Sequence, residues 1–188
     1  AGWSDSDGDG ILDKQIGGSK IPLKFTIITN ADNDLRRNSA LLIKDQLNNQ
    51  ENKLGIKVDV KFVSWEDLNN DFIKTGDFDM LLMGYYLSFF PDLAFTFHTD
   101  GESNFYGFSN SELDLLFAKA KAAKNNQILK DTYKEIQKKL ISELPVISLY
   151  FRTAKLMTNN KISGIEEPRE LDIYRNIQDW YVVRETTE

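Results

Sequence analysis

Acidic side chains recur near the amino terminus at the spacing of a calcium-binding loop. The stretch Asp5–Asp13 carries aspartates at its first, third, fifth and ninth positions, with Gly10 at the sixth. Alternate carboxylates of such a loop point inward, and the glycine permits the sharp turn between them. The twelfth position is Ile16, where the helix–loop–helix class of calcium loop has a bidentate glutamate. The candidate ligands are Asp5, Asp7, Asp9, Ile11 through its main chain, and Asp13; the alternative is a solvated acidic turn.

No other side chains have the types and spacing of a catalytic centre. Cysteine is absent and His98 is the only histidine, which excludes a thiolate nucleophile and a zinc site built on cysteines or histidines. No serine–histidine–aspartate spacing accompanies His98, so we expect a structural role for it. Asp77 and Asp92 flank a predicted strand and lie about 25 Å apart at the rise of an extended chain, too far for a glycosidase acid pair. We expect a protein that is not an enzyme and requires no cofactor, although its acidic loop could bind calcium.

Aromatic residues gather in an irregular segment at the end of the apolar run Phe78–Tyr86. They are Tyr85, Tyr86, Phe89, Phe90, Phe95, Phe97, Phe105, Tyr106 and Phe108. More aromatic residues are present than the packing of one strand requires. Aromatic side chains at the carboxyl end of a strand suit a wide, adaptable ligand pocket. The sequence has no glycine-rich phosphate loop, so a nucleotide ligand is not indicated.

The elements that must position these side chains alternate between strands and helices. Strands are predicted at Ile21–Thr29, Ile56–Val63 and Phe78–Tyr86, with helices at Asp34–Asn49 and from Ser64 to about residue 74. This β-α-β-α-β order implies right-handed crossovers and a doubly wound sheet. The strand Phe78–Tyr86 does not alternate, so both of its faces should be covered.

The second half of the chain is predicted to begin with helices. These span about Ser111–Ala123 and Asn126–Leu144, and Pro145 stops the second. The apolar run Val146–Phe151 and the aromatic tail Ile173–Val183 are predicted strands, whereas residues 4–20 are predicted to be a loop. We expect residues 1–188 to form one three-layer α/β lobe with a central mixed sheet.

Composition limits the partners of the chain. Its 188 residues suit one domain, or a large lobe of something bigger. A net charge of −6 and a pI of about 4.9 disfavour nucleic acid as a partner. No apolar run approaches the roughly 20 residues of a membrane helix. No signal peptide is visible, so we expect a mature form or an excised piece.

Short motifs follow one another in order along nearly the whole chain. They are Gly2-Trp3, Asp5–Leu12, Leu23–Thr29, Asn33–Arg36, Gly76–Asp79, Gly84-Tyr85, Pro91-Asp92, Asn104, Gly107–Asn110, Leu113-Asp114, Pro145–Phe151 and Asn176–Trp180. Their order and spacing resemble the C-terminal lobe of the family 5 extracellular solute-binding proteins, the oligopeptide, dipeptide and nickel receptors of ABC importers.

The resemblance implies a lobe of the type II periplasmic-binding-protein fold in a two-lobed receptor that closes on its ligand like a hinge. Residues 173–188 would return toward the other lobe. The implied partners are a peptide or other small solute, ABC permease subunits and the chain's own N-terminal lobe, with no nucleic acid. The implied location is extracytoplasmic: the periplasm, or the cell surface with a lipid anchor.

The resemblance also implies where the solute binds. Members that bind peptides hold the ligand main chain with the residues that follow a Gly-Trp pair, which correspond here to Tyr85–Ser88. Ser88 stands where many members have an aspartate for the ligand's amine. The predicted contacts, at the carboxyl ends of the first and third strands, are Tyr85, Tyr86, Leu87, Ser88, Asn30, Phe105, Tyr106 and Phe108.

Two other classes of function have less support in the sequence than the receptor. A calcium-dependent structural or adhesion module would rest on Asp5–Asp13 alone, and it does not exclude the receptor. A hydrolase lacks any supporting constellation.

Overall fold

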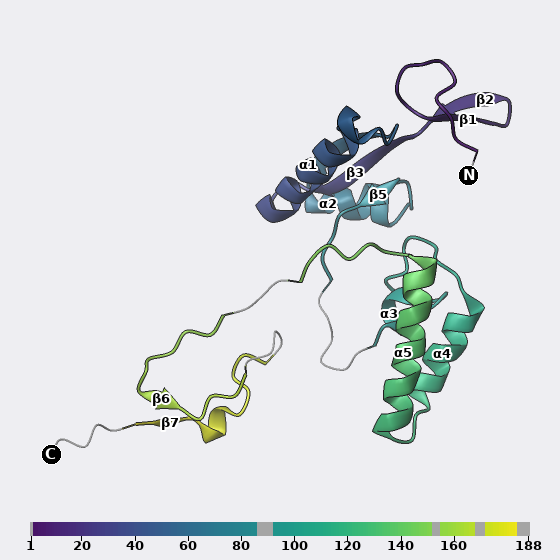
Figure 1. Ribbon diagram of the computed structural model, residues 1–188. Helices are drawn as coiled ribbons and strands as arrows, with labels where there is room; N and C mark the ends of the chain where they lie inside the picture. Colours follow the sequence, from purple (N-terminus) through teal and green to yellow (C-terminus); the bar gives the residue numbers. More distant parts are fainter. Residues whose placement is uncertain (1, 86–91, 152–154, 168–171, 184–188) are drawn as a thin grey trace. The chain divides into compact units, whose positions relative to one another are not determined.

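The computed structural model describes residues 2–85, 92–151, 155–167 and 172–183 (Figure 1). The chain divides into two compact units, each described by itself below. The first unit comprises residues 1–86 and 95–114, and the second comprises residues 87–94 and 115–188. The prediction of a single lobe over residues 1–188 stays a prediction.

A three-stranded parallel sheet forms the centre of the first unit. Its strands lie in the order β4 (Lys57–Val63), β3 (Lys24–Asn30) and β5 (Met80–Leu81). β3 pairs with β4 along its full length and with β5 only at Ile27 and Ile28. Helical segments connect the strands, so the predicted β-α-β-α-β order and parallel pairing are confirmed.

Helix α1 (Asp34–Asn48) covers one face of this sheet. The Asn33 side chain caps the helix by accepting the Arg36 main-chain N–H at 3.0 Å. Ala40 is fully buried and packs with Ile27 and Val58. Its small side chain therefore sets a close approach between the helix and the sheet.

The next crossover lies over the other face. Ser64 caps the short helix α2 (Trp65–Asp67) by accepting the Asp67 N–H at 3.0 Å, and a π-helical turn, η2 (Leu68–Ile73), follows. The Lys61 ammonium lies 4.7 Å from the centre of the Phe72 ring. Lys61 is opposite Ile28 in the ladder, and successive side chains of a strand point to opposite faces, so this face is not the one that α1 covers.

A hairpin precedes the sheet, where the sequence predicted a loop. Strands β1 (Asp13–Ile16) and β2 (Ser19–Pro22) pair antiparallel. Their turn is Gly17-Gly18, with φ of 58° and 83°, and two left-handed residues are what a tight two-residue hairpin turn requires. The predicted single strand Ile21–Thr29 was also wrong, because the chain divides at Leu23, whose N–H donates to the Leu12 carbonyl at 2.7 Å.

Both predicted helices of the second half are confirmed. They are α4 (Ser111–Lys121) and α5 (Asn126–Glu143), which lie side by side (Figure 1). Lys119 and Glu135 form an ion pair between them at 3.0 Å. A further short helix, α3 (Ala94–Phe97), and a 3-10 turn, η1 (Gln50–Asn52), were not predicted.

Of the two predicted late strands, the first was wrong and the second is limited to the end of the tail. The stretch Val146–Phe151 is not a strand, and Phe151 is 75% exposed. The tail contains a 3-10 turn, η3 (Ile177–Asp179), and the strand β7 (Tyr181–Val182), which pairs antiparallel with β6 (Ile162–Ser163). A strand forms only where another strand supplies its backbone hydrogen bonds. Within the described ranges no strand pairs with Val146–Phe151, and none joins the central sheet antiparallel, as a mixed sheet would require.

The third predicted strand is much shorter than Phe78–Tyr86, because only Met80 and Leu81 pair in the ladder.

None of the helices in the described part of the chain combines the length and apolar character needed to cross a bilayer.

Candidate functional site

The carboxyl ends of β3 and β5 meet at one edge of the sheet, as the sequence predicted. Beyond β5 the chain still follows β3, since the Leu82 N–H donates to the Ile28 carbonyl at 3.0 Å. The buried Thr29 hydroxyl donates to the Leu82 carbonyl at 2.8 Å. The chain then reaches Gly84 and Tyr85 beside Asn30, the last residue of β3.

Asn30 is buried at this edge, with 5% of its surface exposed. Its side-chain oxygen accepts a hydrogen bond from Arg36 Nη1 at 2.7 Å. Its amide nitrogen donates to the Asp32 carboxylate. The predicted contact residue thus also joins two charged side chains that lie closer to solvent.

Arg36 was not predicted as a site residue. Its guanidinium lies against Gly84, since a Cβ added at Gly84 would be 3.1 Å from Arg36 Nη2. Gly84 does not have a positive φ, so backbone conformation does not require glycine there. A glycine in an extended segment is the one sequence signal that pointed to a close approach.

The predicted aromatic contacts of the 105–108 segment pack against one another. The Phe105 ring lies edge-on to Tyr106 at 5.6 Å and to Phe78 at 6.4 Å. The Tyr106 hydroxyl donates to the Thr96 carbonyl at 2.8 Å. Burial raises the pKa of Tyr106, and the nearby Tyr85 phenol raises it further. Burial also raises the pKa of Tyr85, so both phenols stay neutral at physiological pH.

Asn104 fixes the loop that carries these aromatics. Its side-chain oxygen accepts the Phe108 N–H at 3.0 Å, and its amide donates to the carbonyls of His98, Thr99 and Phe108 at 3.0, 3.1 and 2.6 Å. The loop is therefore held by side-chain bonds, where a strand or helix would use its own backbone.

His98 takes part in the same structural network. Its Nδ1 accepts the Asp100 N–H at 3.0 Å, and its Nε2 lies 3.8 Å from the Asp114 carboxylate. Asp114 also accepts from the Thr99 N–H at 2.9 Å and its hydroxyl at 2.6 Å. These contacts agree with the structural role expected for His98.

The remaining predicted contacts, Tyr86, Leu87 and Ser88, lie outside the described residues. Those that are described, Asn30, Tyr85, Phe105, Tyr106 and Phe108, all belong to the first unit. Tyr85 is 46% exposed, so a substantial apolar surface is available to a ligand here. This edge can bind and orient an extended solute.

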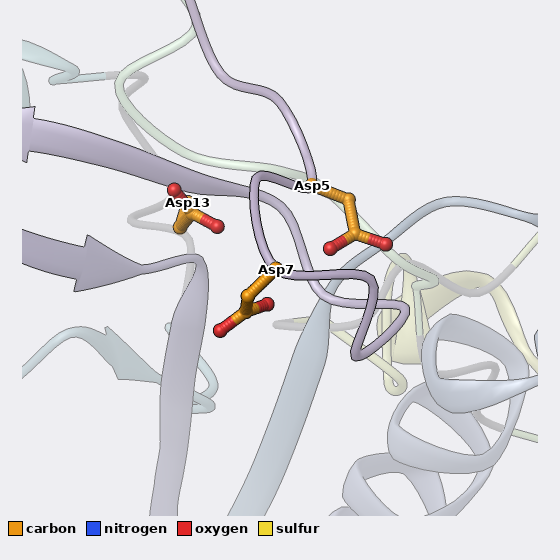
Figure 2. Close-up of side chains that lie close together, drawn as sticks. All are labelled: Asp5, Asp7 and Asp13. Carbon is orange, nitrogen blue, oxygen red and sulfur yellow. The ribbon is translucent and has the colours of Figure 1, made fainter.

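The acidic loop brings together three of its predicted ligands (Figure 2). One carboxylate oxygen from each of Asp5, Asp7 and Asp13 lies within 4.8 Å of the others. The Asp5 carboxylate also accepts the main-chain N–H groups of Gly8 and Gly10 at 2.8 and 3.0 Å. Three carboxylates of the predicted loop therefore lie close to one another, while calcium binding stays a prediction.

Asp9, a further predicted ligand of the loop, is not part of that group of carboxylates. Asp9 accepts the N–H of Ile11 at 2.8 Å. Calcium requires six to eight oxygen ligands, so three carboxylates would be an incomplete shell.

A lysine already neutralises part of this charge. The Lys20 ammonium bonds to Asp7 and lies 3.3 Å from Asp13 Oδ2. The hydrogen bond from Lys20 lowers the pKa of Asp7, whereas the pKa of Asp13 is lowered first by the Ser6 hydroxyl, at 2.7 Å, and then by the Ser6 N–H. Lys20 and a bound cation would compete for the same oxygens.

A parallel sheet with crossover helices, whose strands end together at one edge, is typical of α/β ligand-binding domains. Residues 1–107 match the family model described as bacterial extracellular solute-binding proteins, family 5, middle region. This match spans more than half of the sequence, and the chain belongs to that family. The family is one of solute-binding proteins and not of enzymes, in agreement with the expectation.

Individual relatives agree with this assignment. The chain is 32% identical to the oligopeptide-binding protein AppA of Bacillus subtilis across 98% of its own residues, and it spans 33% of AppA. The structure of that AppA in complex with a nonapeptide matches with a TM-score of 0.73 and 30% identity, covering 97% of this chain and 35% of AppA.

A more distant relative has the same fold. An oligopeptide-binding protein of Thermus thermophilus, complexed with a pentapeptide, matches with a TM-score of 0.70 at 22% identity, over 80% of this chain and 28% of that protein. The chain therefore spans about a third of the length of the relatives that it matches.

Proposed function

We propose that the chain is a peptide-binding lobe of an extracellular receptor that delivers oligopeptides to an ABC importer. The observation that carries the proposal is the edge at the carboxyl ends of β3 and β5, where Asn30 and the partly exposed Tyr85 lie, in a chain similar to AppA over almost all of its residues. An exposed aromatic side chain such as Tyr85 suits peptides of varied sequence.

The lobe belongs to a two-lobed receptor of the type II periplasmic-binding-protein fold. Three layers, with a mixed sheet in the centre, make up the lobe, and residues 173–188 return toward an N-terminal lobe. Its partners are that second lobe and the permease subunits of the importer, and the receptor sits at the cell surface on a lipid anchor or in the periplasm. The chain's one-third share of AppA supports this proposal.

Calorimetric titration tests the proposed ligand class. The longest natural chain that contains residues 1–188 is titrated with peptides of five and of nine residues, and with free amino acids as the control. We expect saturable binding of the peptides and none of the amino acids, because an extended edge gains affinity from successive residues. Binding of single amino acids in preference to peptides would contradict the proposal.

Calcium binding by the acidic loop stays a prediction. Because Lys20 would compete with calcium for the same oxygens, the test compares the calcium-dependent melting temperature of wild type and a Lys20 variant. Calcium at 100 times its dissociation constant stabilises a protein by about 2.7 kcal/mol, which corresponds to several degrees in melting temperature. Lys20→Met removes the competing ammonium, so the calcium-dependent shift should be larger than in the wild type. Lys14→Met, which changes another lysine of the same hairpin, is the control. Equal melting in calcium and in chelator for both wild type and Lys20→Met would remove the loop from consideration.

A further inference from the structure

Arg36 places a cation at the edge where the solute is proposed to bind. It belongs to the first turn of α1, and its guanidinium reaches back to the end of β3, where Nη1 donates to Asn30 at 2.7 Å. Its Nη2 lies beside Gly84, the residue before the exposed Tyr85. The guanidinium therefore lies between the carboxyl ends of two neighbouring strands.

Asn30 orients this guanidinium by a hydrogen bond. Asn30, which orients it, is itself buried and bonded to Asp32. Throughout the described part of the chain, no carboxylate lies within the 4.0 Å ion-pair distance of Arg36. The neighbouring Arg37 differs, because its Nη1 is 3.1 Å from Asp34 and its guanidinium lies over the Phe62 ring at 5.5 Å.

The close approach of Gly84 is a second observation that places the Arg36 guanidinium at this edge. An added Cβ would be 3.1 Å from Nη2, closer than side chains normally approach. The backbone at Gly84 does not have a positive φ, and a side chain there would require the guanidinium to move by a few tenths of an ångström. Arginine has five N–H donors, and the only acceptor described for the Arg36 side chain is Asn30. Among the described residues no acceptor is seen for the others, which suit a planar, two-oxygen acceptor.

We propose that Arg36 binds a carboxylate of the peptide at this edge, and that Asn30 is its positioning residue. This proposal rests on the proposed peptide-binding function and adds a specificity to it. The carboxylate comes either from the C-terminus of the peptide or from an acidic side chain, and both present the same pair of oxygens.

The test compares three peptides on the longest natural chain that contains residues 1–188. The first is a neutral pentapeptide with a free C-terminal carboxylate, the second is its C-terminal amide, and the third is that amide with one glutamate. Wild type should bind at least one of the two carboxylate-bearing peptides about tenfold or more tightly than the plain amide. The peptide that gains affinity identifies the source of the carboxylate.

Arg36→Gln should abolish that preference, so that the carboxylate-bearing peptides bind no more tightly than the plain amide. Arg37→Gln is the matched control and should keep the preference. Gly84→Ala retains the charge but requires the guanidinium to move by a few tenths of an ångström, so it should reduce the preference as well. It gives a second measurement of the preference if Arg36→Gln does not fold.

Two results would overturn the proposal: equal wild-type affinity for all three peptides, or an equal loss for all three in Arg36→Gln, which would mean a purely structural arginine. A wild-type protein that binds none of the peptides would instead contradict the proposed function itself.

Discussion

The 188-residue chain alone should bind a peptide at least about a hundredfold more weakly than the longest natural chain that contains it. In a two-lobed receptor the ligand is enclosed between the lobes, and one lobe supplies only about half of the contacts. Loss of the other half removes several kcal/mol, and each 1.4 kcal/mol is about tenfold in affinity. Titration of both proteins with the same nonapeptide measures the ratio.

The control for this comparison is thermal unfolding of the 188-residue chain, which should be cooperative. A folded chain that binds the nonapeptide as tightly as the longer protein would mean that residues 1–188 hold the complete site, and the lobe proposal would be wrong.

Ile27→Ala should destabilise the first unit by about 2–5 kcal/mol. Ile27 is 2% exposed and packs with Ala40 and Val58 in the core. It lies in β3, between β4 and β5. Its truncation leaves a cavity at the centre of the sheet. Urea unfolding measures the loss, as a lower transition midpoint.

Leu42→Ala is the matched control, because Leu42 lies on α1 but is 58% exposed. A change within about 0.5 kcal/mol is expected for it. Equal losses for the two variants would show that this sheet is not the core of the unit.

Local signals predicted the helices well. Asn33 and Asn125 each accept a main-chain N–H at the start of a long helix, and Pro145 follows the left-handed Leu144 that ends α5. Strict alternation likewise predicted β4. Such features act within a few residues, so the sequence alone contains them.

Non-local pairing was predicted less well. The stretch Val146–Phe151 has the composition of a buried strand, but composition does not reveal whether a partner strand is present. The β1–β2 hairpin was missed for a different reason: its Gly17-Gly18 turn is a recognisable signal, but the acidic and glycine-rich surroundings favoured a loop.

The candidate site was predicted in part, because topology alone brings Asn30 and Tyr85 to one edge. Arg36 was missed because helical spacing alone gives no reason for its side chain to reach back to β3. The glycine at Gly84 was the available clue. It was interpreted only as part of a family motif and not as space for a neighbouring side chain.

Hydrogen exchange with and without a bound nonapeptide tests most directly the central claim that the edge at the carboxyl ends of β3 and β5 binds the peptide. The account predicts that added protection concentrates at residues 30–36, 84–85 and 104–108, because these segments surround the guanidinium and the aromatic surface. Backbone N–H groups covered by a ligand exchange more slowly, and the acidic loop, α4 and α5 should remain unchanged. Protection confined to Asp5–Asp13 or to α4 and α5, with none at these three segments, would contradict it.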